Sequence, residues 1–151
     1  QGMPGPPDLE PSVARKRLLQ QHAALRERMR AACEVADATR AGRASPGELA
    51  GAVRALKAAF VEHNRLEETW LAPLLRATDS YGEVRIARML GEHAEEHQAF
   101  VGFLDHAIDV LITGLADFAE EIEAHMDAEE RTFLHPHVLR DDLVVADTTG
   151  G

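Results

Sequence analysis

Apolar residues recur along this chain at alternating spacings of three and four positions, which is the period of one face of an α-helix. Four such stripes follow one another, beginning at Leu18, Leu49, Ile86 and Leu115. No segment shows the alternation that a half-buried β-strand would need. The pattern therefore predicts an all-α protein, and four amphipathic helices joined by short connections predict an up-down-up-down four-helix bundle.

Glycine, proline and capping residues mark where each predicted helix begins and ends. Ser45-Pro46-Gly47-Glu48 has the form of a capping box with proline at the first helical position. Pro73 is expected to kink or end the second helix, and Thr113-Gly114 to separate the third helix from the fourth. We expect the bundle to span residues 12–139. Residues 1–11 are expected to be a disordered segment with a cloning remnant at its start, and residues 140–151 a loose tail.

The stripes that should form the core also contain seven polar residues. They are His22, His63, Glu67, His93, His97, His125 and Glu129. Burying a polar group costs roughly 1–3 kcal/mol when the group has no partner. Seven such groups in one small core therefore need a common binding partner. A metal site in the core supplies that partner, because every one of these side chains can donate a lone pair to a cation.

The seven residues also lie at one level of the predicted bundle. In an antiparallel bundle, residues at the same height are equally far from the turn between their helices. The midpoints of successive polar positions fall between Arg43 and Ala44, at Ser80 and at Leu111, in or near the expected turns. All four helices would therefore bring their polar residues to one layer. The neighbouring pair Glu95-Glu96 is expected on a solvated face.

Composition and charge limit the partners. The formal net charge is −10, which argues against nucleic acid or an anionic membrane as the main partner, since both need a basic surface. Cys33 is the single cysteine, so neither an intramolecular disulfide nor a cysteine-based metal site is expected. No apolar run reaches the roughly 18 residues of a membrane span. A cytoplasmic location is the expectation; the sequence says nothing about oligomeric state.

The arrangement of these residues resembles that of hemerythrin-like domains. A histidine on the first helix is followed by His-x3-Glu, His-x3-His and His-x3-Glu on the next three. The strings that carry the resemblance are Leu18-Leu19-Gln20-Gln21-His22, His63-Asn64-Arg65-Leu66-Glu67, His93-Ala94-Glu95-Glu96-His97 and His125-Met126-Asp127-Ala128-Glu129. The resemblance covers roughly residues 12–137. It implies a four-helix bundle that holds two non-haem iron ions.

The resemblance also implies a role for each residue. His93, His97 and His125 would hold one iron. His22 and His63 would hold the other, and Glu67 and Glu129 would bridge the two irons together with an oxo or hydroxo group. Glu129 is preferred to its neighbour Glu130 because it lies on the apolar stripe. This ligand set leaves one coordination position open, on the iron with two histidines.

An open position is where a small exogenous ligand binds, so the first hypothesis is a protein that carries, stores or senses dioxygen or a related ligand such as peroxide or nitric oxide. The second hypothesis is an enzyme that disproportionates hydrogen peroxide or detoxifies reactive oxygen or nitrogen species. The third is a metal-responsive interaction module. Zinc or manganese also suits these ligand types. No residue in the sequence separates carrier from enzyme.

Overall fold

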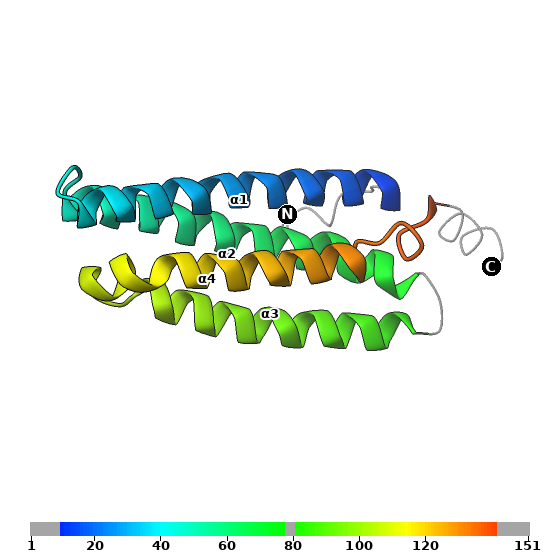
Figure 1. Cartoon of the computed structure of the whole chain (residues 1–151). Coiled ribbons are helices and arrows are strands. Elements are labelled where there is room, and N and C mark those ends of the chain that lie inside the picture. Colours follow the sequence, from blue (N-terminus) through cyan, green and yellow to red (C-terminus); the bar gives the residue numbers. More distant parts are fainter. Residues whose placement is uncertain (1–9, 78–80, 142–151) are drawn as a thin grey trace, which may run out of the picture.

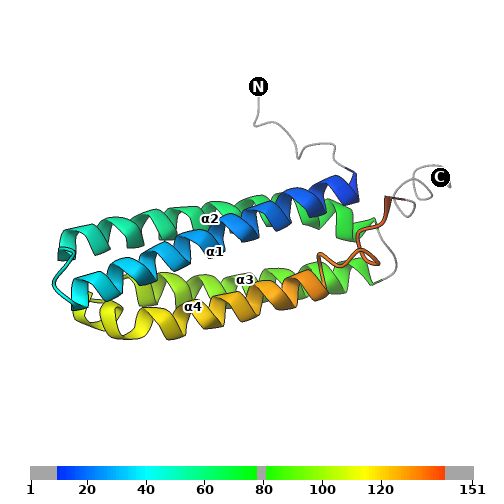
Figure 2. The same ribbon diagram turned by 45° about the horizontal axis from the view of Figure 1, so that its top comes forward.

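The computed structural model describes residues 10–77 and 81–141, and these contain four α-helices and no β-strand. The helices are α1 (Pro11–Arg40), α2 (Pro46–Arg76), α3 (Gly82–Leu104) and α4 (Ile108–Arg131). Consecutive helices run antiparallel and together form one bundle (Figures 1 and 2). The predicted all-α four-helix bundle is confirmed. The expectations for residues 1–9 and 142–151 lie outside the described residues.

The first connection follows the local chemistry of the sequence. Gly42 has a φ of 77°, a left-handed conformation that glycine adopts without a steric penalty. Ser45 caps α2, because its side chain accepts a hydrogen bond from the backbone N–H of Glu48 at 3.1 Å. α2 then continues through Pro73 and ends three residues later at Arg76.

The third connection lies earlier than the sequence predicted. α3 ends at Leu104 and α4 begins at Ile108, so the expected break at Thr113-Gly114 is wrong. Gly114 lies inside α4, where an added Cβ would come within 2.9 Å of Cε1 of Phe103. This glycine therefore allows the Phe103 ring to pack closely against α4 and does not end a helix.

The buried face of α3 is turned by about one position from the predicted stripe. Met89 and Glu96 are buried, whereas Leu90 is 42% exposed and His97 is also exposed. A helix has 3.6 residues per turn, so spacings of three and of four describe almost the same face. This small rotation decides which acidic or imidazole side chains of α3 reach the core.

The core consists of two apolar clusters with a polar layer between them. On α1 the order is Leu18 in one cluster, His22 in the layer and Leu25 in the other cluster. α2 and α3 cross the three regions in the same way, while α4 spans the Leu25 cluster and the layer and ends at Arg131, so all four helices place polar residues at the same height. The cluster that contains Leu18 also contains Phe133 and Leu134, from the segment after α4.

The ends of the described chain meet beside the cluster that contains Leu18. Asp141 accepts hydrogen bonds from the backbone N–H and the hydroxyl of Ser12, at 2.9 and 2.8 Å. α1 begins at Pro11, one residue before the start expected for the bundle. None of the helices in the described segments is long and apolar enough to cross a membrane.

Candidate metal centre

Five of the seven predicted site residues come together in the polar layer. His22 comes from α1, His63 and Glu67 from α2, His93 from α3 and Glu129 from α4. All five are buried; His22 and Glu67 have no exposed surface at all. Potential ligand atoms form two groups that share Glu129, and within each group they lie within 4.8 Å of one another: His22, His63, Glu67 and Glu129 in the first, and His93, Glu96 and Glu129 in the second.

Glu67 and Glu129 each face histidines on two sides of this cluster. Oε2 of Glu67 lies 3.3 Å from Nε2 of His22 and 3.2 Å from Nε2 of His63, while its Oε1 lies 2.6 Å from Nε2 of His93. Glu129 repeats the pattern, with Oε1 3.3 Å from His22 and Oε2 2.7 Å from His93. Each carboxylate therefore spans from the His22 side to the His93 side, the position that a bridging carboxylate needs.

The outward-facing nitrogens of the same histidines contact polar side chains. Nδ1 of His22 lies 2.7 Å from Oε2 of Glu130, and Nδ1 of His93 lies 3.4 Å from Oε2 of Glu68. Nδ1 of His63 donates to Oε1 of Gln21 at 2.8 Å. Such outer partners fix the orientation and tautomer of a ligating imidazole, so that Nε2 points to the metal.

The carboxylates also control the protonation of the metal-free cluster. Burial alone lowers the pKa of His22, but its contacts with Glu129 and Glu67 outweigh burial and raise the pKa to about 10. The same balance of burial against Glu129 and Glu67 raises the pKa of His93 to about 11. Burial raises the pKa of Glu67, yet its three histidine neighbours hold it well below its usual value. Without a metal, protons on imidazoles neutralise the buried carboxylates.

The cluster keeps buried polar atoms that protein groups do not satisfy. Among the described residues, Nε2 of His63, Nδ2 of Asn64 and Oε1 of Glu67 are buried without a hydrogen-bond partner. Oε1 of Glu67 lies close to Nε2 of His93, but the two atoms lack hydrogen-bond geometry. Buried polar atoms without partners are rare in native proteins. Two of these three are metal-ligand atoms in the cluster, so the residues present fit a bound cation.

The structure does not bring the remaining two predicted residues into the cluster. His97 lies on the exposed side of α3, and the side chain of His125 is 51% exposed on α4. Nδ1 of His125 still lies 3.6 Å from Oε1 of Glu96, at the edge of the cluster. Met126, the residue after His125, takes the buried position on that helix.

Glu96 is the residue that the sequence analysis missed. It was expected on a solvated face with Glu95, which is wrong for Glu96, since it is 9% exposed and groups with His93 and Glu129. Burial and the nearby charge of Glu129 raise its pKa to about 7. The signal was present in the sequence, because Glu96 follows His93 by three positions and so shares its helix face. Glu130, the alternative to Glu129, lies outside the cluster at Nδ1 of His22.

A four-helix bundle with a buried layer of imidazoles and carboxylates defines a metal-binding protein. The hemerythrin HHE cation-binding domain family matches residues 13–135, and the chain belongs to this family. The family implies that the chain binds a metal, and the buried histidine and glutamate cluster is the candidate site among the described residues. Searches of curated proteins and of solved structures give no match.

Proposed function

We propose that the bundle holds two iron ions and binds dioxygen, or a related small ligand such as peroxide or nitric oxide, at one open coordination position. In this proposal His22 and His63 hold one ion, while His93, His97 and His125 hold the other. Glu67 and Glu129 bridge the pair, together with an oxo or hydroxo group. The protein would carry, store or sense the ligand, and iron would supply the reversible redox chemistry on which binding depends.

The observation that carries the proposal is the placement of the two carboxylates. Glu67 and Glu129 each direct one oxygen to His22 and the other to His93. A single ion would not need both carboxylates to span both sides of the cluster. Two ions held a few ångströms apart would, since a bridging carboxylate gives one oxygen to each metal.

The surrounding residues prepare this site in two ways. Gln21, Glu130 and Glu68 hold the outward nitrogens of His63, His22 and His93, which keeps each Nε2 directed inward. The two apolar clusters above and below the layer exclude water from it. Exclusion of water strengthens the electrostatic interactions inside the site and slows loss of electrons to solvent.

The test is to quantify iron and record the near-UV and visible spectrum through anaerobic reduction, exposure to oxygen and removal of oxygen. Two irons per chain, with absorption bands that appear under oxygen and vanish when it is removed, are expected. A chain that binds no stoichiometric iron, or one iron only, would overturn the paired site. Irreversible oxidation of two bound irons would overturn the carrier role.

One observation favours a second candidate, an enzyme that disproportionates hydrogen peroxide. Glu96 is a buried carboxyl group with a pKa of about 7, so it can hold and release a proton near neutral pH. It groups with His93 and Glu129 and not with His63, so in this candidate it would serve peroxide bound at the ion beside His93 and not at the open position of the carrier proposal. Evolution of dioxygen from added peroxide, lost in Glu96→Gln at unchanged iron content, would identify the enzyme.

A further inference from the structure

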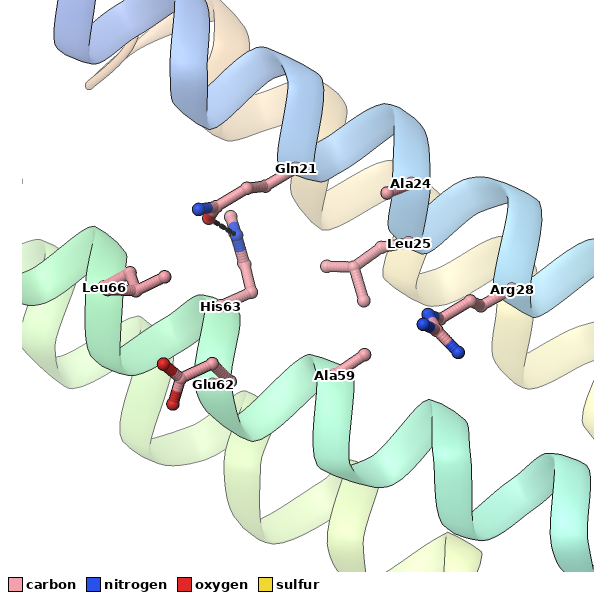
Figure 3. A pocket seen from close by; sticks show the side chains of 8 residues that line it. All are labelled: Gln21, Ala24, Leu25, Arg28, Ala59, Glu62, His63 and Leu66. Atoms are coloured by element: carbon pink, nitrogen blue, oxygen red, sulfur yellow. Dashed lines mark hydrogen bonds between the residues drawn. The ribbon is translucent and has the colours of Figure 1, made fainter.

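A pocket of about 220 Å³ lies between α1 and α2 on the side of the cluster that carries His63. Its walls are Ala24 and Leu25 from α1 and Ala59 and Leu66 from α2 (Figure 3). The two alanines leave the hollow because their side chains do not fill the space between the helices. Ala24 is exposed, so the pocket opens to solvent.

The inner end of the pocket is formed by the Gln21 and His63 pair. Figure 3 shows the hydrogen bond between them, in which Nδ1 of His63 donates to Oε1 of Gln21. His63 is itself 5% exposed, and its other nitrogen, Nε2, lies 3.2 Å from Oε2 of Glu67 in the cluster. One imidazole ring therefore separates the pocket from the metal centre, with a nitrogen on each side.

We infer that this pocket is the entry site through which a small uncharged ligand reaches the metal centre beside His63. The inference rests on the proposed function, because it assumes that the open coordination position lies on the ion held by His22 and His63. It adds the route and the chemical class of the ligand.

The lining selects against charged ligands. Four apolar side chains form the walls, and moving an unpaired ion from water into such surroundings costs several kcal/mol or more. Arg28 and Glu62 at the mouth carry opposite charges, so they give no net attraction to an anion or a cation. Apolar cavities of about 150 Å³ bind xenon, so this one is large enough for a diatomic molecule.

Filling the pocket tests the route. The double variant Ala24→Leu/Ala59→Leu places two larger side chains in the hollow while keeping residues of good helix propensity. The matched control is Ala23→Leu/Ala58→Leu, because these alanines are exposed on the same two helices, next to the first pair, and do not line the pocket. All three proteins are loaded with iron, reduced without oxygen and mixed with nitric oxide in a stopped-flow spectrometer.

The filled variant is expected to bind nitric oxide about tenfold more slowly than wild type and to release it more slowly by the same factor, with an unchanged dissociation constant. Filling the pocket raises the activation barrier for entry and exit of nitric oxide but leaves the free energies of the free and bound states unchanged. Damage to the metal site would instead change the dissociation constant. The control variant should bind at the wild-type rate. Equal rates in the filled variant and wild type would overturn the entry role and leave the proposed function intact.

Xenon gives a second measurement that does not require iron. Under xenon pressure, the methyl resonances of Ala24 and Leu66 in the metal-free protein should shift in wild type. In the filled variant, the Leu66 methyls should no longer shift. If the pocket methyls of wild type do not respond, apolar ligands do not enter the pocket and the inference is wrong. If wild type takes up two irons but does not bind nitric oxide, the open coordination position, the proposed function and the entry role are all wrong. This holds even if xenon binds in the pocket.

Discussion

His22 and Glu130 contact each other across the bundle, with Nδ1 of His22 2.7 Å from Oε2 of Glu130 although the two residues are 108 positions apart. His22 is fully buried, while Glu130 is partly exposed and also lies 3.1 Å from Nη1 of Arg26. This chain of contacts links the metal layer to the surface through α1 and α4. It also gives Glu130 a different task from its neighbour Glu129, which faces the cluster directly.

Glu130→Gln is expected to weaken iron binding without abolishing it. The amide keeps the shape of the side chain but removes the charge that orients His22 and makes it more basic. Loss of such an outer partner lowers metal affinity by about tenfold to hundredfold. Competition with a chelator measures the change. Asp127→Asn is the matched control, since Asp127 is an exposed acidic residue on the same helix that contacts Arg26 but not His22. An equal effect of both variants would contradict the orienting role of Glu130.

Glu129→Gln is expected to have the larger effect. Its carboxylate contacts His22 and His93 with separate oxygens, and an amide nitrogen cannot replace an anionic oxygen as a metal ligand. The variant should therefore hold at most one iron per chain, measured by metal analysis after gel filtration. If Glu129→Gln kept two irons while Glu130→Gln lost one, Glu130 would be the bridging residue.

Metal loading is expected to release protons. Burial lowers the pKa of His22 and His93, but contacts with Glu129 and Glu67 raise the values to about 10 and about 11, so both imidazoles are protonated in the metal-free protein at neutral pH. A ligating nitrogen must lose its proton, so binding should release about two protons per chain and grow tighter as pH rises. An indicator dye in weakly buffered solution measures the release on addition of zinc, which has no redox chemistry. Loading without a change in pH would contradict this protonation pattern.

The same two histidines set the pH dependence of the metal-free fold. Their folded pKa values are raised above 6.5, so their contribution to stability is complete below that pH and is lost as pH rises through about 10 and 11. The free energy of unfolding of the metal-free protein should therefore fall between neutral and alkaline pH. Urea titrations across this range measure it. Stability that stayed constant would show that these imidazoles are neutral.

The sequence predicted most of the fold because the apolar stripes and the polar layer agree with each other. On α1 every predicted stripe residue from Leu18 to Ala32 is buried. The prediction failed at Gly114, because the sequence alone does not distinguish a glycine that makes room for an aromatic ring from a glycine that ends a helix. It also missed Glu96, because the predicted stripe continued from His93 to His97 at a spacing of four, whereas the buried face continues from His93 to Glu96 at a spacing of three. The spacing of the apolar positions does not predict the contacts of Gln21 with His63 and of Glu130 with His22.

Glu96→Gln should stabilise the metal-free protein at alkaline pH and have little effect at acidic pH. Burial and the charge of Glu129 raise the pKa of Glu96 from 4.5 to about 7, so its favourable contribution is present below 4.5 and is lost as pH rises through 7. The amide stays neutral, so the Tm of the variant should exceed that of wild type by about 3 °C at alkaline pH. Glu95→Gln is the control, because its exposed carboxyl should show no such trend. A constant difference at all pH values would contradict the raised pKa.

The resemblance assigns His97 and His125 to the metal, whereas the structure places both side chains outside the cluster. Without a metal, His97 is exposed and His125 is half-exposed with only an edge contact to Glu96, because an imidazole that lacks a close partner in the core is better solvated at the surface. A bound ion supplies the missing partner, so both side chains should turn inward on loading. Their reaction with diethyl pyrocarbonate, read by peptide mass spectrometry, should be fast in the metal-free protein and slow after loading. His137 is exposed beyond the end of α4 and should react equally in both states. If His97 and His125 stay as reactive as His137 with two irons bound, neither is a ligand, and the ion beside His93 must be held by Glu96 and the bridging carboxylates instead.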